Sequence, residues 1–245
     1  MRKQIHDNSI NRDRSCALSH GTWRRVGAKL VCAGACALMA GQLLLPSVAL
    51  AAEWVNVGGT QYSKAAGDDA GTWSWDGADD MKLSGYDGGS IGAKGNLTIG
   101  VTGTNTVTAD AGQSAIAVKN GNLAITGDGT LNATAQNDVI AASGDGRTGG
   151  DVTIDGADVN VTATGGAYES IGIHAAAGDI AIKNGADVHV EAKSNADVFA
   201  VLAENVPPRH SAIEGAQAEE ADYSAKHGGC IMVDNAKLKA LLDQH

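Results

Sequence analysis

Four aspartates have the type and spacing to hold a metal ion. They form two pairs, Asp151 with Asp179 and Asp158 with Asp187, whose members lie 28 and 29 residues apart at equivalent positions of an internal repeat. Carboxylates stacked in this way repel one another, and a bound Ca²⁺ would remove the repulsion because hard cations prefer carboxylate and carbonyl oxygens. These residues are therefore a candidate calcium site. The alternative is that the carboxylates point into water, where the repulsion is tolerable.

Three aromatic side chains near the start of the repeat could bind a sugar. Trp73 and Trp75 stand two residues apart, and Tyr86 follows them. Alternate residues of a strand share a face, so the two indoles would form a platform on which a sugar ring can stack. The alternative is a structural role, in which the aromatic residues shield the terminal coil of a solenoid from water and from other edges.

The candidate residues lie on or beside a tandem repeat of about 28 residues. Five stretches follow one pattern, and they start 26, 29, 28 and 51 residues apart. They read GNLTI at 95, GNLAI at 121, GDVTI at 150, GDIAI at 178 and GCIMV at 229. Each is followed by a second alternating strand, and most are preceded by a third short strand, the last of which is SAIEG at 211. The longest interval indicates a degenerate coil or an inserted loop between Asn195 and Gly228.

Three strands per repeat predict an all-β fold, a right-handed parallel β-helix with three-strand coils. In each strand the apolar residues fall two apart, as in Leu97 and Ile99, which places them on one interior face. β-Branched residues at this period, with glycine at nearly every strand boundary, argue against helices. One coil buries too little apolar surface to fold alone, so the coils must stack. A β-sandwich is the alternative, because it also has short alternating strands and glycine-rich turns.

Equivalent positions in stacked coils form ladders with steps of about 4.8 Å. One ladder follows the repeat glycine and is predicted to cap turns: Asn96, Asn122, Asp151, Asp179 and Cys230. The other lies in the second strand and contains the second aspartate pair: Thr106, Thr130, Asp158, Asp187 and Lys237. The sequence has no EF-hand loop and no nonapeptide calcium repeat, so composition alone indicates calcium.

The N-terminal segment has the pattern of an export signal. Residues 1–29 contain seven basic and two acidic residues, and an uncharged run follows from Leu30 to Ala52. Small residues at Ala49 and Ala51 predict cleavage after Ala51, and so an extracellular protein, secreted or held at the cell surface. A retained membrane anchor is the alternative, which glycines and a proline within the run disfavour. The expected divisions are a signal peptide (1–51), an aromatic-rich cap (52–87), regular coils (88–194) and irregular C-terminal coils (195–245).

The predicted mature chain is acidic. Without residues 1–51 it keeps 11 basic and 26 acidic residues, a net charge of about −15. Nucleic acid and anionic lipid are disfavoured as partners, since both require a basic surface, and we expect no membrane insertion after cleavage. Cys230 is the one cysteine beyond residue 51, so no internal disulfide is expected and stability must come from packing.

The residues 71–109, reading GTWSWDGADDMKLSGYDGGSIGAKGNLTIGVTGTNTVTA, resemble the start of bacterial extracellular β-helix proteins known as carbohydrate-binding-domain-containing proteins. In that family a WSWD-like strand is followed by an LxGY turn and then by GDLTI units. The later units continue the resemblance to about residue 194. It implies a cell-surface or secreted β-helix, with some relatives linked to calcium and to acidic plant polysaccharides. No ligand residue is carried over from it.

Three functions fit the sequence. The first is a non-catalytic secreted or cell-surface module that binds polysaccharide, with acidic polysaccharide as one candidate, or acts as an adhesin. The second is a pectinase-type polysaccharide lyase or hydrolase, which needs an acidic cluster and a base; the candidate bases are Arg147, Arg209 and Lys183. The third is a purely structural spacer. His174 and His189 lie at outward strand positions, and we assign no catalytic residue.

Overall fold

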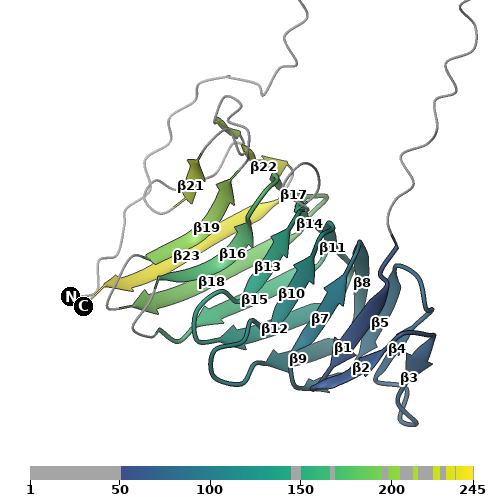
Figure 1. Ribbon diagram of the computed structural model, residues 1–245. Helices are drawn as coiled ribbons and strands as arrows, with labels where there is room; N and C mark the ends of the chain where they lie inside the picture. The colour runs from purple at the N-terminus through teal and green to yellow at the C-terminus, as the bar shows by residue number, and fades with distance from the viewer. Residues whose placement is uncertain are drawn as a thin grey trace, which may run out of the picture.

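The computed structural model shows a stack of β-strands (Figure 1). It describes residues 51–144, 150–165, 169–194, 198–204, 212–214, 223–226, 230–234 and 236–244. Within these ranges the chain forms strands and turns and no helix, and no described helix is therefore long or apolar enough to cross a membrane. The predicted signal peptide lies outside the described residues except for Ala51, which forms an isolated parallel bridge with Asn96.

The coils wind through three parallel sheets, each of which receives one strand per coil. The coil strands of the first sheet are β7 (Ile91–Lys94), β10 (Ile116–Lys119), β13 (Ile140–Ser143), β16 (Ser170–Ala175) and β19 (Val198–Glu204). Those of the second are β8 (Leu97–Thr102), β11 (Leu123–Gly127), β14 (Val152–Asp155), β17 (Ile180–Lys183) and β22 (Cys230–Asp234). Those of the third are β9 (Thr104–Thr108), β12 (Thr130–Ala135), β15 (Asp158–Ala163), β18 (Asp187–Ser194) and β23 (Lys237–Gln244).

The interior is built from ladders of aliphatic side chains. One ladder stacks five residues in parallel register, each at most 1% exposed: Leu97, Leu123, Val152, Ile180 and Ile231. Residues between the inward positions face outward and are more exposed, as the alternating burial of β12 and β15 shows. The first four members of this ladder are each about one repeat apart in the sequence, and an insertion separates Ile180 from Ile231. The predicted parallel β-helix is therefore confirmed, and the β-sandwich alternative is wrong.

The turns between the first and second sheets need residues that accept unusual backbone geometry. Asn120 has φ 57° and Gly95 has φ 103°, conformations that β-branched residues avoid. A Cβ atom at Gly121 would lie 2.2 Å from the carbonyl carbon of Gly95 in the coil below. Glycine at the repeat boundary is thus required by close backbone stacking as well as by φ.

The N-terminal end is closed by antiparallel strands. The strands of this cap are β1 (Trp54–Val57), β2 (Thr60–Tyr62), β3 (Ala66–Gly67), β4 (Trp73–Trp75), β5 (Asp80–Ser84) and β6 (Asp87–Gly88). In the first sheet, β1 pairs antiparallel with both β2 and β7. In the second sheet, β4 pairs antiparallel with both β3 and β5. β5 and β6 then run parallel to β8 and β9 and begin the regular stack.

The long interval before the last repeat contains an insertion. β19 supplies the first-sheet strand of the last coil, and the chain reaches β22 only after β20 (Ala212–Glu214) and β21 (Tyr223–Lys226). β20 pairs with β22 in the second sheet, and β21 pairs with β19 in the first. The expectation that SAIEG at 211 precedes β22 as the third strand of its coil is therefore wrong. Its short alternation resembles that of a first-sheet strand, but pairing places it in the second sheet.

Candidate functional site

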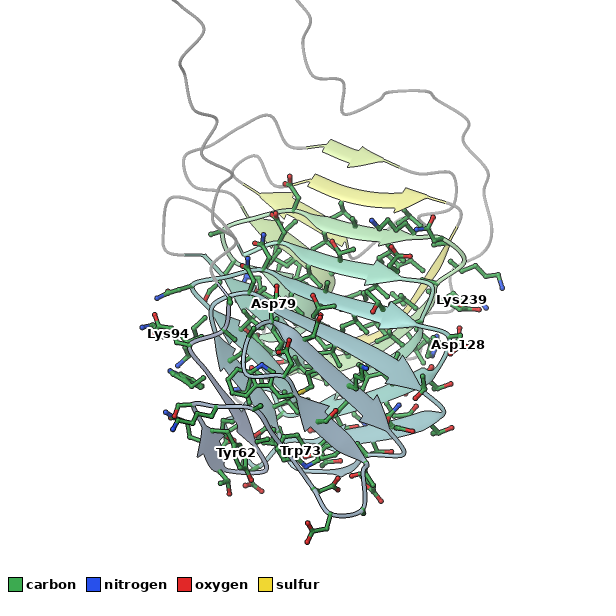
Figure 2. The ribbon with its side chains drawn as sticks, turned by 90° about the vertical axis from the view of Figure 1, so that its right-hand side faces the viewer. Tyr62, Trp73, Asp79, Lys94, Asp128 and Lys239 are labelled. Carbon is green, nitrogen blue, oxygen red and sulfur yellow. The ribbon has the colours of Figure 1, made fainter. Side chains whose placement is uncertain are left out.

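The predicted aromatic residues are buried at the N-terminal end. Trp73, Trp75 and Tyr86 are 7%, 2% and 6% exposed, and all three belong to the hydrophobic core. The Trp75 indole N–H donates to the Ala78 carbonyl (3.1 Å), and the Tyr86 hydroxyl donates to the Gly89 carbonyl (2.9 Å). Figure 2 shows Trp73 beside Tyr62 at the end of the stack, with ring centroids 5.2 Å apart. This burial supports the cap interpretation, because a sugar platform needs an open ring face.

A carboxylate holds the loop before Trp73. Asp68 accepts hydrogen bonds from the Thr72 hydroxyl and from the main-chain N–H groups of Thr72 and Trp73. The Thr72 hydroxyl is the main cause that lowers the pKa of Asp68, with the two N–H groups adding to it. Burial raises the pKa of Tyr86, and the negative charges of Asp68 and Asp87 raise it further. The polar groups of this region thus order the cap.

The predicted turn ladder is present from Asn96 to Asp179, and each of its three links uses a side-chain oxygen. The Oδ1 atoms of Asn96, Asn122 and Asp151 each accept a hydrogen bond from the main-chain N–H one coil further along. The donors are Asn122 (2.8 Å), Asp151 (3.0 Å) and Asp179 (2.8 Å). Because an oxygen suffices, Asn and Asp are interchangeable at this position. The Asp151 oxygen therefore has a structural partner.

The second aspartate pair lies on the outer face of the third sheet. Asp158 and Asp187 are directly paired in register, as predicted, and Asp187 forms an ion pair with Lys237 (3.2 Å). The ladder begins at Thr104, which pairs with Thr130, so the predicted Thr106 is wrong by two residues. A shift of two preserves the inward and outward alternation, so the sequence pattern does not distinguish the two registers.

The four predicted carboxylates do not converge on one site. Asp151 precedes β14 and Asp158 begins β15, so the four residues of β14, about 13 Å of strand, separate the two ladders. Among the described residues, one group of three acidic side chains has carboxylate oxygens within 4.8 Å of one another: Asp76, Asp79 and Asp80. Asp76 Oδ1 accepts main-chain hydrogen bonds from Ala78 and Asp80, which accounts for the tight turn.

One tryptophan has an open side. Trp54 alternates with Val55 and Val57, which are buried, and is itself only partly buried on the outer face of the first sheet. Its indole atom Cζ3 would be 3.9 Å from a Cβ atom at Gly92, so the ring lies beside this glycine. The same alternation in the sequence, WVNV, could have separated Trp54 from the buried pair.

The outer face next to Trp54 has a central row in which three successive residues are glycine or alanine. Asn56, Gly92, Ala117, Ala141 and His174 follow one another in register along five strands. The neighbouring row contains Lys94, Lys119 and Ser143. We call these eight residues with Trp54 the first-sheet face. It is flat over three coils because glycine and alanine leave no side chain beyond Cβ.

The first-sheet face has two lysines, and the carboxylates of Glu53 and Asp138 lie beside it. Lys94 Nζ lies 2.7 Å from Glu53 Oε2, and His174 Nδ1 lies 3.3 Å from Asp138 Oδ2. Lys119 is exposed and has no ion pair within the described part of the chain. Figure 2 places Lys94 on the opposite side of the solenoid from Lys239 of the third sheet. The net negative charge of the whole chain therefore has little effect at this face, because charges beyond about 8 Å are screened at physiological salt.

Of the candidate bases for a lyase, Lys183 lies within the described residues. Lys183 forms an ion pair with Asp155 of the preceding coil (3.5 Å). His189 lies 3.5 Å from Glu191 on the third sheet. Arg147 and Arg209 lie outside the described residues. Cys230 begins β22 and pairs in register with Ala212 of β20.

The stacked three-strand coils define the chain as a parallel β-helix. Comparisons with protein-family models, with curated proteins and with solved structures gave no match. The assignment to this fold class therefore follows from strand pairing alone.

Proposed function

We propose that this chain is a non-catalytic polysaccharide-binding module of the β-helix type, secreted or displayed at the cell surface. The observation that carries the proposal is Trp54, the one partly exposed tryptophan of the described residues, lying beside Gly92 on a flat outer sheet. An indole can stack on the C–H face of a sugar ring, a contact that combines apolar burial with ring geometry. The adjoining row of small residues leaves room for the sugars that follow.

The first-sheet face also favours a ligand that carries carboxylates. Lys119 is exposed on this face, one coil from Lys94 and in register with it. A lysine ammonium beside a stacking platform would pair with an acidic sugar. The Lys94 ammonium already pairs with Glu53, so one cation on this face remains for a ligand. We therefore propose acidic polysaccharide as the preferred ligand and neutral polysaccharide as a weaker one.

A binding experiment with matched variants tests the proposal. Polygalacturonate and a neutral β-glucan are each titrated into the purified protein and into Trp54→Ala, Lys119→Met and, as a control on the third sheet, Thr106→Ala. We expect Trp54→Ala to weaken both ligands about tenfold or more, and Lys119→Met to weaken polygalacturonate alone. Thr106→Ala should bind like the parent chain. Unchanged affinity in Trp54→Ala would refute the site, and absence of binding to either polymer would refute the function.

The same samples separate binding from catalysis. Polygalacturonate is incubated with the protein while the ultraviolet absorbance of unsaturated products is followed. We expect no increase, with or without added Ca²⁺. A steady increase would contradict the non-catalytic proposal and identify the chain as a lyase.

A further inference from the structure

The tripeptide Lys-Asn-Gly occurs twice in the chain, at 119–121 and at 183–185. An Asn-Gly pair is prone to spontaneous deamidation, because glycine has no side chain to hinder attack by its main-chain nitrogen on the asparagine side chain. Both asparagines are exposed, and both have a left-handed backbone, with φ 57° at Asn120 and φ 56° at Asn184. The local sequence and the asparagine conformation are therefore matched, and a difference in reactivity must come from the surroundings of each turn.

The turn at Asn120 is held by both neighbouring coils. The Gly121 N–H donates to the Ser143 carbonyl (3.2 Å), and the Gly121 carbonyl accepts from the Gly150 N–H (3.2 Å). Gly121 is also buried, and it stacks directly on Gly95 of the preceding coil. The Gly121 nitrogen can attack only after this hydrogen bond breaks and the turn leaves its packing.

The turn at Asn184 leaves the corresponding nitrogen open. Gly185 is exposed, and nothing lies within 4 Å of the position that its Cβ atom would take. Its N–H has no hydrogen-bond acceptor among the described residues. The turn between β17 and β18 is one residue longer than the equivalent turn between β14 and β15. The extra residue accounts for the absence of the close stacking that holds Gly121.

We propose that Asn184 is a site of spontaneous deamidation and that Asn120 is protected from it. The Gly185 main-chain nitrogen attacks Asn184 Cγ, and the side-chain nitrogen leaves as ammonia with the proton of the Gly185 N–H. Water then opens the resulting cyclic imide to aspartate or isoaspartate. The proposal is independent of the polysaccharide site on the first-sheet face.

The reaction replaces an attractive contact between coils with a repulsive one. Asn184 Nδ2 donates to Asp155 Oδ1 (2.8 Å), and Lys183 Nζ lies 3.5 Å from Asp155 Oδ2. Deamidation converts the donor to a carboxylate, and a second negative charge beside Asp155 is unfavourable. Isoaspartate also lengthens the main chain close to Ala186, which is fully buried and donates to the Lys183 carbonyl (3.2 Å). We therefore expect the modified chain to be less stable.

Peptide mapping of aged protein by mass spectrometry tests the proposal. The whole chain is incubated at mildly alkaline pH, and deamidation at both asparagines is followed in the folded protein and in urea. We expect Asn184 to react about tenfold or more faster than Asn120 in the folded protein, because the Gly121 N–H must first lose its hydrogen bond and its packing. In urea the two rates should converge, since the tripeptide is the same. Reaction at Asn184 no faster than at Asn120 in the folded protein would overturn the proposal.

Two variants connect the reaction to stability. Asn184→Asp has the side chain of one product and should melt at a lower temperature than the parent chain. Asn184→Gly accepts the same backbone conformation and has no amide to lose. On ageing, the melting temperature of the parent should fall toward that of Asn184→Asp, whereas that of Asn184→Gly should stay constant. An equal fall in the parent and in Asn184→Gly would contradict the assignment to Asn184.

Discussion

The N-terminal cap and the regular coils bury their residues by different means. Each coil repeats the same small aliphatic ladder, so neighbouring coils share the burial of every side chain. The cap is not repeated, and it relies on single large or polar residues such as Trp75 and, where the first coil meets the cap, Asn105 of β9, each of which has its own partners. The stability of the coils is therefore shared among many equivalent side chains, whereas the stability of the cap depends on individual side chains.

Asn105 shows the difference at one position. It occupies the inward register position where the following coils have Leu131, Val159 and Val188, and it is fully buried. Its Oδ1 accepts from the Tyr86 N–H (3.0 Å), and its Nδ2 donates to the carbonyls of Thr102 and Thr130. Only two residues of β6 cover β9 here, so the asparagine supplies the hydrogen bonds that a full strand would supply elsewhere.

The largest expected effect is the loss of Trp75. Trp75→Ala should lower the free energy of unfolding by about 3–5 kcal/mol, because the truncation leaves a cavity at the end of the core. Chemical denaturation monitored by circular dichroism measures it. Phe at the same position should recover much of the loss. A cost below that of Thr106→Ala, an outward substitution on a coil, would break the distinction between cap and coils.

Asn105 should tolerate no aliphatic replacement, although leucine is the native residue one coil later. Asn105→Leu leaves the Tyr86 N–H and two carbonyls without their partner, and an unsatisfied buried group costs about 1–3 kcal/mol. Thermal melting of this variant tests the point. Leu131→Val, a change within the aliphatic ladder, is the matched control and should cost less. A neutral Asn105→Leu would show that water replaces the side chain.

Substitutions at Asp151 should show whether the turn ladder needs the side-chain oxygen or its negative charge. Asp151→Ala removes one hydrogen bond and should cost about 1 kcal/mol, whereas Asp151→Asn keeps the accepting oxygen and should be nearly neutral. Equilibrium denaturation in low and high salt measures both. Strong destabilisation by Asp151→Asn alone would mean that the carboxylate charge has a role, as a bound cation would require.

The smallest expected effect is a pH dependence confined to the cap. The folded-state pKa of Asp68 is lowered below 3.8 by Thr72 and the adjacent N–H groups. Its stabilising contribution is therefore present above the unfolded-state pKa and is lost as the pH falls through the folded-state pKa. Asp68→Asn should abolish this contribution. The acid-induced change in tryptophan fluorescence that Asp68 causes in the parent chain should therefore be absent from the variant. An identical acid profile in the variant would assign that transition to other carboxylates.

The sequence by itself determined the fold class, because a period-two pattern of aliphatic residues, repeated about every 28 residues with glycine at the boundaries, can bury its interior only by stacking coils. It also determined the turn ladder, whose members differ between Asn and Asp while keeping one oxygen.

The tertiary structure decided which side of each strand is covered. Trp73 and Trp75 share a face in the sequence, yet only the packing of β4 on β5 shows that this face is the core. It also set the register of Thr104 with Thr130 and placed β20 in the second sheet. A period-two pattern does not distinguish these alternatives, because shifts of two residues and exchanges between sheets preserve the alternation. Only the contacts between coils select one arrangement.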